Sequence, residues 1–117
     1  MAKHNTLGKA GEQQALQHLL NKNYTLLESN YKAGKAEVDI IMQDKNFIVL
    51  VEVKTRSTNY FGTPEESVND KKQNLLRTAA EAYMEQNNLD LEIRFDIVSV
   101  LNKGSQFSIH HIVDAFR

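Results

Sequence analysis

The 117-residue sequence has no cysteine. This absence excludes disulfide bonds, thiolate zinc sites and a cysteine nucleophile together. No apolar run approaches the length of a membrane span, and the N-terminus has no apolar region of the signal-peptide kind. We therefore expect a cytoplasmic protein that does not contact a membrane.

An excess of positive charge is also missing. The formal net charge is −1, whereas a protein that binds nucleic acid by electrostatics alone is strongly basic. Contact with phosphate would have to come from a local patch, or from metal ions held by carboxylates. The hydrophobic content of 41% and the charged content of 25% are typical of a soluble globular protein. The length predicts one domain over residues 1–117.

The pattern of apolar and turn residues predicts a mixed α/β domain with a sheet flanked by helices. The expected helices are residues 8–21 and about 63–86, and the expected strands are residues 24–31, 37–42, 47–54, 91–101 and 106–113. Gly8 and Gly11 weaken the first turn of the first helix. Thr63 or Ser67 is the expected cap of the second helix. The apolar stripe of the first helix is Ala15, Leu16, Leu19 and Leu20.

The third predicted strand organises the chain, because it opens with five apolar residues and closes with Glu52-Val53-Lys54. Side chains alternate along a strand, so Glu52 and Lys54 share one face while Val53 points to the other. Burying a charge is costly unless the charge is paired or bound to a metal. The end of this strand therefore predicts chemistry.

Asp39 interrupts the neighbouring apolar strand, and the turn residues 43–46 predict that the two strands form an antiparallel hairpin. Asp39 then lies opposite a residue between Leu50 and Glu52, and Glu37 lies on the same face as Asp39. Two acids in one dry place repel each other. A divalent cation with oxygen ligands, Mg²⁺ or Mn²⁺, relieves that repulsion. The alternative is a buried ion pair of Lys54 with Asp39 or Glu52 and no chemistry.

Glu12 and Lys72 each allow two interpretations, and two adjacent histidines are considered with them. Glu12 is either a first-turn residue favoured by the helix dipole or a member of the site. Lys72 either extends its stem to solvent or takes a direct role. His110 and His111 face opposite sides of a strand, so one is expected to be exposed and the other an ordinary hydrogen-bonded side chain.

Asp39, then Glu52-x-Lys54, after a helical Glu12, resembles the PD-(D/E)XK nucleases, which share the restriction-endonuclease-like fold with an αβββαβ core. Within that superfamily the chain is similar to the YraN family of small bacterial proteins, often labelled as endonucleases. The stretches that carry the resemblance are GKAGEQQA (8–15), EVDII (37–41), VEVKTR (51–56), FGTP (61–64), RFDIV (94–98) and residues 111–116, together with Val68, Lys72 and Gln73.

The resemblance implies a metal-dependent nuclease that hydrolyses phosphodiester bonds in DNA or structured nucleic acid. Asp39 and Glu52 would bind Mg²⁺ or Mn²⁺ with the backbone carbonyl of Val53, and Glu12 would complete the site directly or through water. Lys54 would orient the attacking water or stabilise the developing negative charge. Phosphate-contact and supporting roles would fall to Lys35, Glu37, Arg56, Lys72 and Gln73.

Two positions depart from the pattern: Ala36 stands where the family usually has Gly, and Val38 stands where the superfamily motif has Pro. The competing hypothesis is a non-catalytic nucleic-acid-binding or adaptor module that retains the nuclease fold. The near-neutral charge favours weak or partner-assisted binding. The expected partner is nucleic acid, DNA first, and a homodimer would let two sites act on two strands.

Overall fold

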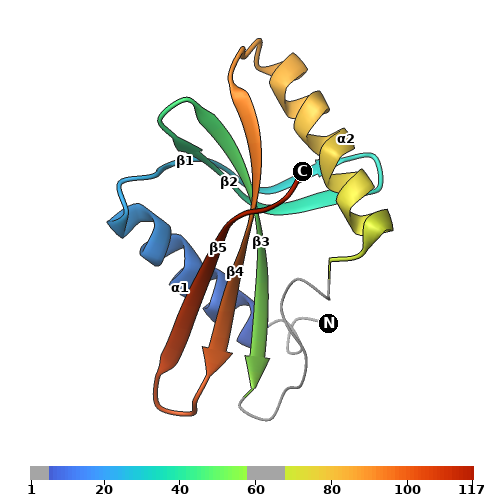
Figure 1. Cartoon of the computed structure of the whole chain (residues 1–117). Coiled ribbons are helices and arrows are strands. Elements are labelled where there is room, and N and C mark those ends of the chain that lie inside the picture. The colour runs from blue at the N-terminus through green and yellow to red at the C-terminus, as the bar shows by residue number, and fades with distance from the viewer. Residues whose placement is uncertain (1–5, 58–67) are drawn as a thin grey trace.

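The computed structural model describes residues 6–57 and 68–117 (Figure 1). Its elements are α1 (Thr6–Asn21), β1 (Thr25–Ala33), β2 (Ala36–Asp44), β3 (Phe47–Ser57), α2 (Asp70–Gln86), β4 (Glu92–Asn102) and β5 (Phe107–Phe116). This order confirms the predicted succession of helix, three strands, helix and two strands. Neither helix in the described residues is long and apolar enough to cross a membrane.

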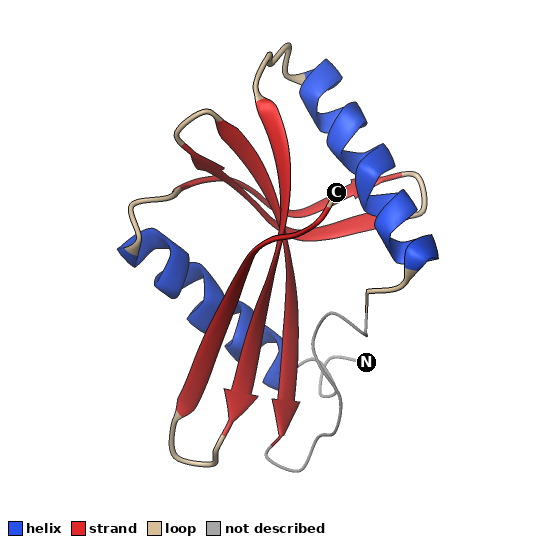
Figure 2. Ribbon diagram, viewed as in Figure 1, coloured by secondary structure: helices blue, strands red, loops and turns tan. Residues whose placement is uncertain are grey.

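The five strands form one mixed sheet in sequence order, from β1 at one edge to β5 at the other. Strands β3 and β4 are parallel, and every other neighbouring pair is antiparallel. Parallel neighbours need a crossover connection, and α2 lies in the one between β3 and β4. Helix α1 packs on β3, β4 and β5, and α2 packs on β1 and β2 (Figure 2).

Each helix covers its own apolar cluster, on opposite faces of the sheet. Ile48 and Leu50 belong to the cluster under α2, whereas Val49 and Val51 belong to the cluster under α1. The four residues are at most 2% exposed. A strand that is covered on both faces needs apolar residues at successive positions. This explains the unbroken apolar run at the start of β3.

Strands β2 and β3 pair only from Asp44 and Phe47 to Ile40 and Val51. Beyond that point β3 continues beside β4 and β2 continues beside β1, so the two strands diverge (Figure 1). We call this divergence the fork. Strict alternation would place Val38 and Ile40 on one face, but they pack in opposite clusters. The pleat of β2 therefore breaks at Asp39, where the fork begins.

Two details differ from the sequence-based expectations. Leu20 is 39% exposed and does not join the buried stripe, because Ala15 and Leu19, one turn apart, face the sheet and the next residue is rotated away. The second helix begins at Asp70, and the side chain of Asn69 caps it by accepting a hydrogen bond from the Lys72 N–H. The expected caps Thr63 and Ser67 lie outside the described residues.

Candidate functional site

Glu52 lies on β3 one residue past the last β2–β3 pair and is 5% exposed. Its Oε2 atom is 3.4 Å from Lys54 Nζ and 3.1 Å from Lys72 Nζ of α2. Its Oε1 atom is buried, and no hydrogen-bond donor among the described residues reaches it. Buried polar atoms ordinarily have a partner. One oxygen of this carboxylate is thus paired with two ammonium groups, and the other is an open acceptor.

Asp39 lies on the other branch of the fork, and its Oδ2 atom accepts a hydrogen bond of 2.8 Å from the Val53 N–H. This bond fixes the carboxylate beside β3. Burial raises the pKa of Asp39 to about 7, the charges of Glu52 and Glu12 add to the increase, and the Val53 N–H opposes it. The raised pKa reflects first the removal of Asp39 from water and second the nearby negative charge of Glu52 and Glu12.

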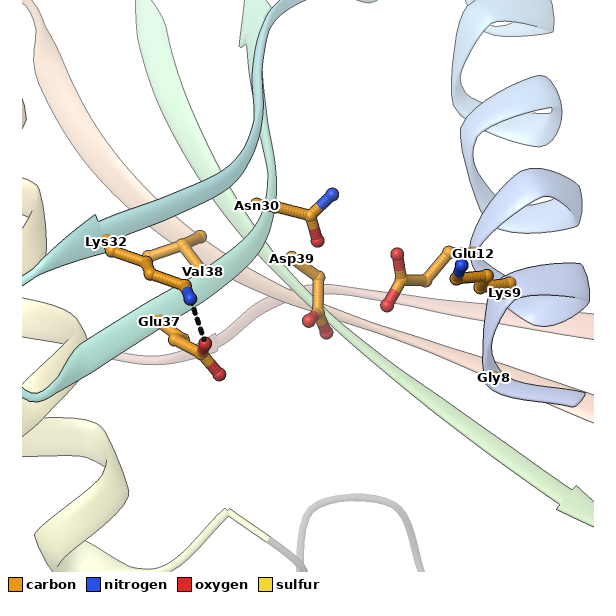
Figure 3. Close-up of a pocket in the computed structure, with 8 residues that line it drawn as sticks. All are labelled: Gly8, Lys9, Glu12, Asn30, Lys32, Glu37, Val38 and Asp39. Atoms are coloured by element: carbon orange, nitrogen blue, oxygen red, sulfur yellow. Dashed lines mark ion pairs between the residues drawn. The ribbon is translucent and has the colours of Figure 1, made fainter. Parts of the chain in front are cut away.

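Glu12 points from α1 toward Asp39 (Figure 3). Burial raises its pKa, and the charge of Glu52 raises it further, whereas Lys9 lowers it. Helix α1 begins at Thr6, and its first turn holds no acidic residue. The interpretation of Glu12 as a first-turn residue is therefore wrong.

Helix α1 approaches β3 closely at Gly11, which is buried. A Cβ atom at this position would collide with the side chain of Thr55. The missing side chain of Gly11 thus allows the approach that brings Glu12 to the fork. In the sequence Gly11 reads only as a weak helix former, because its neighbour Thr55 lies more than forty residues away.

A pocket of about 370 Å³ opens between α1 and the β1–β2 hairpin, with Glu12 and Asp39 in its lining (Figure 3). An adjoining pocket of about 230 Å³ shares Lys9, Glu12, Asn30 and Asp39 with it. Sequence reasoning assigned no role to Lys9, Asn30 or Lys32. Lys9 carries a weak signal, since it precedes Glu12 by three residues on one helix face. Asn30 and Lys32 reach the pocket only through strand pairing.

The candidate supporting residues differ in whether their side chains reach the acids of the fork. Lys72 reaches Glu52, which favours the direct role over an extension to solvent. Gln73 does not reach the acids: its Nε2 donates to the Val68 carbonyl at 3.0 Å, and its Oε1 accepts from Arg77. Glu37 lies at the pocket rim and pairs with Lys32 at 3.4 Å.

The other two candidate cations stand apart from these contacts. Lys35 is exposed in the turn between β1 and β2 and is absent from the described lining of the pocket. Arg56 is half-buried on β3, two residues beyond Lys54 and therefore on the same face.

Carboxylate and carbonyl oxygens are the ligands that Mg²⁺ and Mn²⁺ prefer. Glu52 Oε1 is an open acceptor of this kind, and the charges of Glu52 and Glu12 add to the increase that burial causes in the pKa of Asp39. Within residues 6–57 and 68–117, however, no three acidic or histidine side chains already stand close enough to hold a metal ion. The oxygen ligands present are therefore of the type that suits a hard cation, but Glu52 is turned toward two lysines.

Comparisons with known proteins match the chain along most of its length. A model of the family described as "Uncharacterised protein family UPF0102" matches residues 11–100. The UPF0102 protein of Flavobacterium psychrophilum is 49% identical over 116 residues, which cover 99% of this chain and 98% of the relative. The UPF0102 protein of Phocaeicola vulgatus is 40% identical over 116 residues, which cover 99% of this chain and 96% of the relative.

Proposed function

This chain belongs to the UPF0102 family, and we propose that it is a metal-dependent nuclease that hydrolyses phosphodiester bonds in DNA or structured nucleic acid. The observation that carries the proposal is the fork, where Glu12, Asp39 and Glu52 converge from three elements beside Lys54. The resemblance to PD-(D/E)XK nucleases and the YraN family supports it, because the matching acids and lysine are the ones at the fork.

Asp39, Glu52 and the backbone carbonyl of Val53 would hold the cation, with Glu12 as a further ligand directly or through water. A bound Mg²⁺ or Mn²⁺ would polarise the scissile phosphate and lower the pKa of a water molecule. The Val53 N–H holds Asp39 in place from the backbone. The fork thus positions its ligands through β3 itself.

Lys54 supplies positive charge on the same face as Glu52. An ammonium group there would stabilise the negative charge that develops on the phosphate and would orient the attacking water. Lys72 approaches the same carboxylate from α2. A cation that binds Glu52 would displace the two lysines from this carboxylate and leave their ammonium groups available to the phosphate. Binding of the cation and binding of the phosphate would therefore favour each other.

One observation favours a second candidate function, a nucleic-acid-binding or adaptor module without turnover. Glu52 is already paired with both lysines, and the acids of the described chain are not gathered into a ready metal site. A protein that kept these ion pairs permanently would present lysines and a shaped surface but no activated water.

Metal binding is the first test. Isothermal titration with Mn²⁺ is expected to show binding that Asp39→Asn and Glu52→Gln each abolish. The exposed acid Glu81 on α2 provides a control, because Glu81→Gln removes one carboxylate elsewhere on the surface. Binding that persists in both fork variants would remove the metal assignment.

Cleavage separates the two functions. The protein is incubated in Mn²⁺ with junction, flap, nicked, single-stranded and duplex DNA, and with RNA. We expect cleavage of at least one of these, lost in Lys54→Ala with binding retained, and unchanged in Lys71→Ala, which removes an exposed lysine of α2. Binding without cleavage of any substrate would favour the adaptor.

A further inference from the structure

The two pockets beside α1 share four lining residues and are continuous, so we treat them as one trough. One wall is the N-terminal half of α1, which contributes Lys9 and Glu12, and the other is the β1–β2 hairpin, which contributes Asn30 and Asp39 (Figure 3). The trough starts at the acids of the fork and leads away from Lys54 and Lys72, which approach Glu52 on the face covered by α2.

Positive charge therefore lies on both sides of the acids. Lys54 and Lys72 lie on one side, and Lys9 lies on the other, where its charge lowers the pKa of Glu12. Lys32 stands on the hairpin rim, in an exposed pair with Glu37 that solvent screens. A polynucleotide backbone is a row of negative charges at regular spacing. Cations on both sides of a cleavage site match the phosphates on both sides of the scissile one.

Asn30 adds a neutral donor to this wall. Its φ of 53° places it in the left-handed region, which asparagine tolerates better than most residues. The flanking pairs Ser29–Ile40 and Tyr31–Val38 hold β1 in register on either side. The side chain of Asn30 projects beside Asp39 (Figure 3). Its amide carries two N–H donors, which can bind a phosphate oxygen.

We propose that the trough binds a single, unpaired strand that continues from the scissile phosphate, with Lys9 and Asn30 contacting the next phosphate along; this proposal rests on the proposed nuclease function. The larger of the two pockets that form the trough has a volume of about 370 Å³, at the small end of the range for ligand pockets, about 300–1,000 Å³. It accepts a nucleotide unit but no duplex. Among the described residues, those that line the trough include no aromatic side chain for base stacking, so we infer contact through the backbone that is independent of base sequence.

The test uses a short fluorescein-labelled DNA strand of mixed sequence, alone and annealed to its complement, with binding followed by fluorescence anisotropy in Ca²⁺. The variants are Lys9→Gln and Asn30→Gly. Glycine accepts a positive φ, so Asn30→Gly removes the amide without straining β1. Matched controls are Lys45→Gln, in the turn between β2 and β3, and Asn88→Gly, since Asn88 also has a φ of 53° and follows α2.

We expect Lys9→Gln and Asn30→Gly to weaken binding of the single strand by about tenfold, as loss of a hydrogen bond to a charged group does. The slope of log affinity against log salt should fall by about 0.7 in Lys9→Gln, the value for one phosphate contact on a single strand. Lys45→Gln and Asn88→Gly should behave as the unmodified chain. Thermal melting of each variant separates lost contacts from lost folding.

Failure of this proposal differs from failure of the proposed function. If the unmodified protein binds and cleaves nucleic acid but the trough variants match their controls, the trough assignment is wrong and the nuclease remains. Tighter binding of the duplex than of the single strand would likewise overturn the unpaired-strand assignment. If no nucleic acid binds at all, both proposals fail together.

Discussion

Half-buried Asp39 and buried Asp96 are both carboxyls of the sheet, and their surroundings move their pKa values in opposite directions. The pKa of Asp39 is raised to about 7 by burial and by the charges of Glu52 and Glu12. Burial alone would also raise the pKa of Asp96, but hydrogen bonds from His111 and Arg94 outweigh it and hold the pKa below its usual value. The same residue type is left short of partners in one place and fully partnered in the other.

The partners of Asp96 form a closed network. Oδ1 accepts from Arg94 Nε at 2.9 Å and from the Asp114 N–H at 3.0 Å, and Oδ2 accepts from Arg94 Nη2 at 2.9 Å. His111 Nε2 completes the set at 2.7 Å. Because the Lys22 ammonium only donates, and lies 2.8 Å from His111 Nδ1, the proton of the neutral ring lies on Nε2.

This difference is the one expected between a structural site and the metal site that we propose at the fork. A carboxylate with every lone pair occupied stabilises the fold and has no capacity for a ligand. A group of carboxylates that raise one another's pKa is unfavourable by itself and gains from a cation. Perturbed pKa values gather at functional sites, but structural ion pairs also perturb pKa values. The direction of the shift and its cause are therefore used together to tell the two kinds of site apart.

The largest expected effect is on stability. Asp96→Asn removes the buried one of the two carboxylates that pair with Arg94 and leaves only Asp44, and we expect the free energy of unfolding to fall by about 3 kcal/mol. Asp39→Asn should change it little or increase it, because neutralising Asp39 removes repulsion from Glu52. Urea unfolding in EDTA measures both. Equal losses in the two variants would mean that the fork is a structural site of the same kind.

The close approach at Gly11 provides the next effect. Gly11→Ala should cost about 1–3 kcal/mol, because the new methyl group overlaps Thr55. Gly8→Ala is the matched control: no atom of the described residues lies within 4 Å of a Cβ there, and alanine favours a helix. Thr55→Ala in the same chain as Gly11→Ala should recover part of the loss. A stabilising Gly11→Ala would show that α1 does not need this contact.

The fold could be predicted from the sequence because its signals are local. The apolar run of β3 and the turn after β2 set the hairpin, and the hairpin register brought Asp39 to Glu52. Adjacent positions also predicted that one of His110 and His111 is exposed and the other hydrogen-bonded; His110 is the exposed one, and the side chain of His111 bonds Asp96. Each of these inferences needed only alternation or spacing along one or two neighbouring strands.

The rest of the site depends on contacts between distant segments. Lys72 reaches Glu52 because α2 covers that face of β3, and Gly11 fits Thr55 because of the path of α1. The break in the pleat at Asp39 has no local sequence signal, since Val38, Ile40 and Ile41 are all apolar. The backbone bond from Val53 to Asp39 follows from that break. Such features arise only when the strands diverge.

The two carboxyls also predict opposite responses to pH. The pKa of Asp39 in the folded protein, about 7, lies above the ordinary value of 3.8. The stability that the fold gains from protonated Asp39 is therefore complete below about pH 3.8 and is lost as the pH rises through 7. The pKa of Asp96 is lowered in the folded protein, so the ionised carboxylate stabilises the fold above about pH 3.8, and this stabilisation is lost as the pH falls.

Urea unfolding in EDTA at a series of pH values tests these signs. Between about pH 4 and 7 the free energy of unfolding should decline by about 1–2 kcal/mol through Asp39, allowing for screening. Asp39→Asn should flatten this decline and leave the acid limb of the profile unchanged. If the decline persists in Asp39→Asn, then a group other than Asp39 takes up the proton that causes it.

The smallest expected effect concerns Glu12. Glu52 contributes more than Glu12 to the raised pKa of Asp39, so Glu12→Gln should lower that pKa, and Glu52→Gln should lower it further. The free energy of unfolding should change by only about 0.5 kcal/mol in Glu12→Gln, as for most half-exposed sites. The pKa of Asp39 is read from the carboxyl carbon by NMR titration in EDTA, with Glu81→Gln as the control. An Asp39 pKa that is the same in Glu12→Gln and in Glu81→Gln would remove Glu12 from the fork and leave Asp39, Glu52, Lys54 and Lys72 as its charged residues.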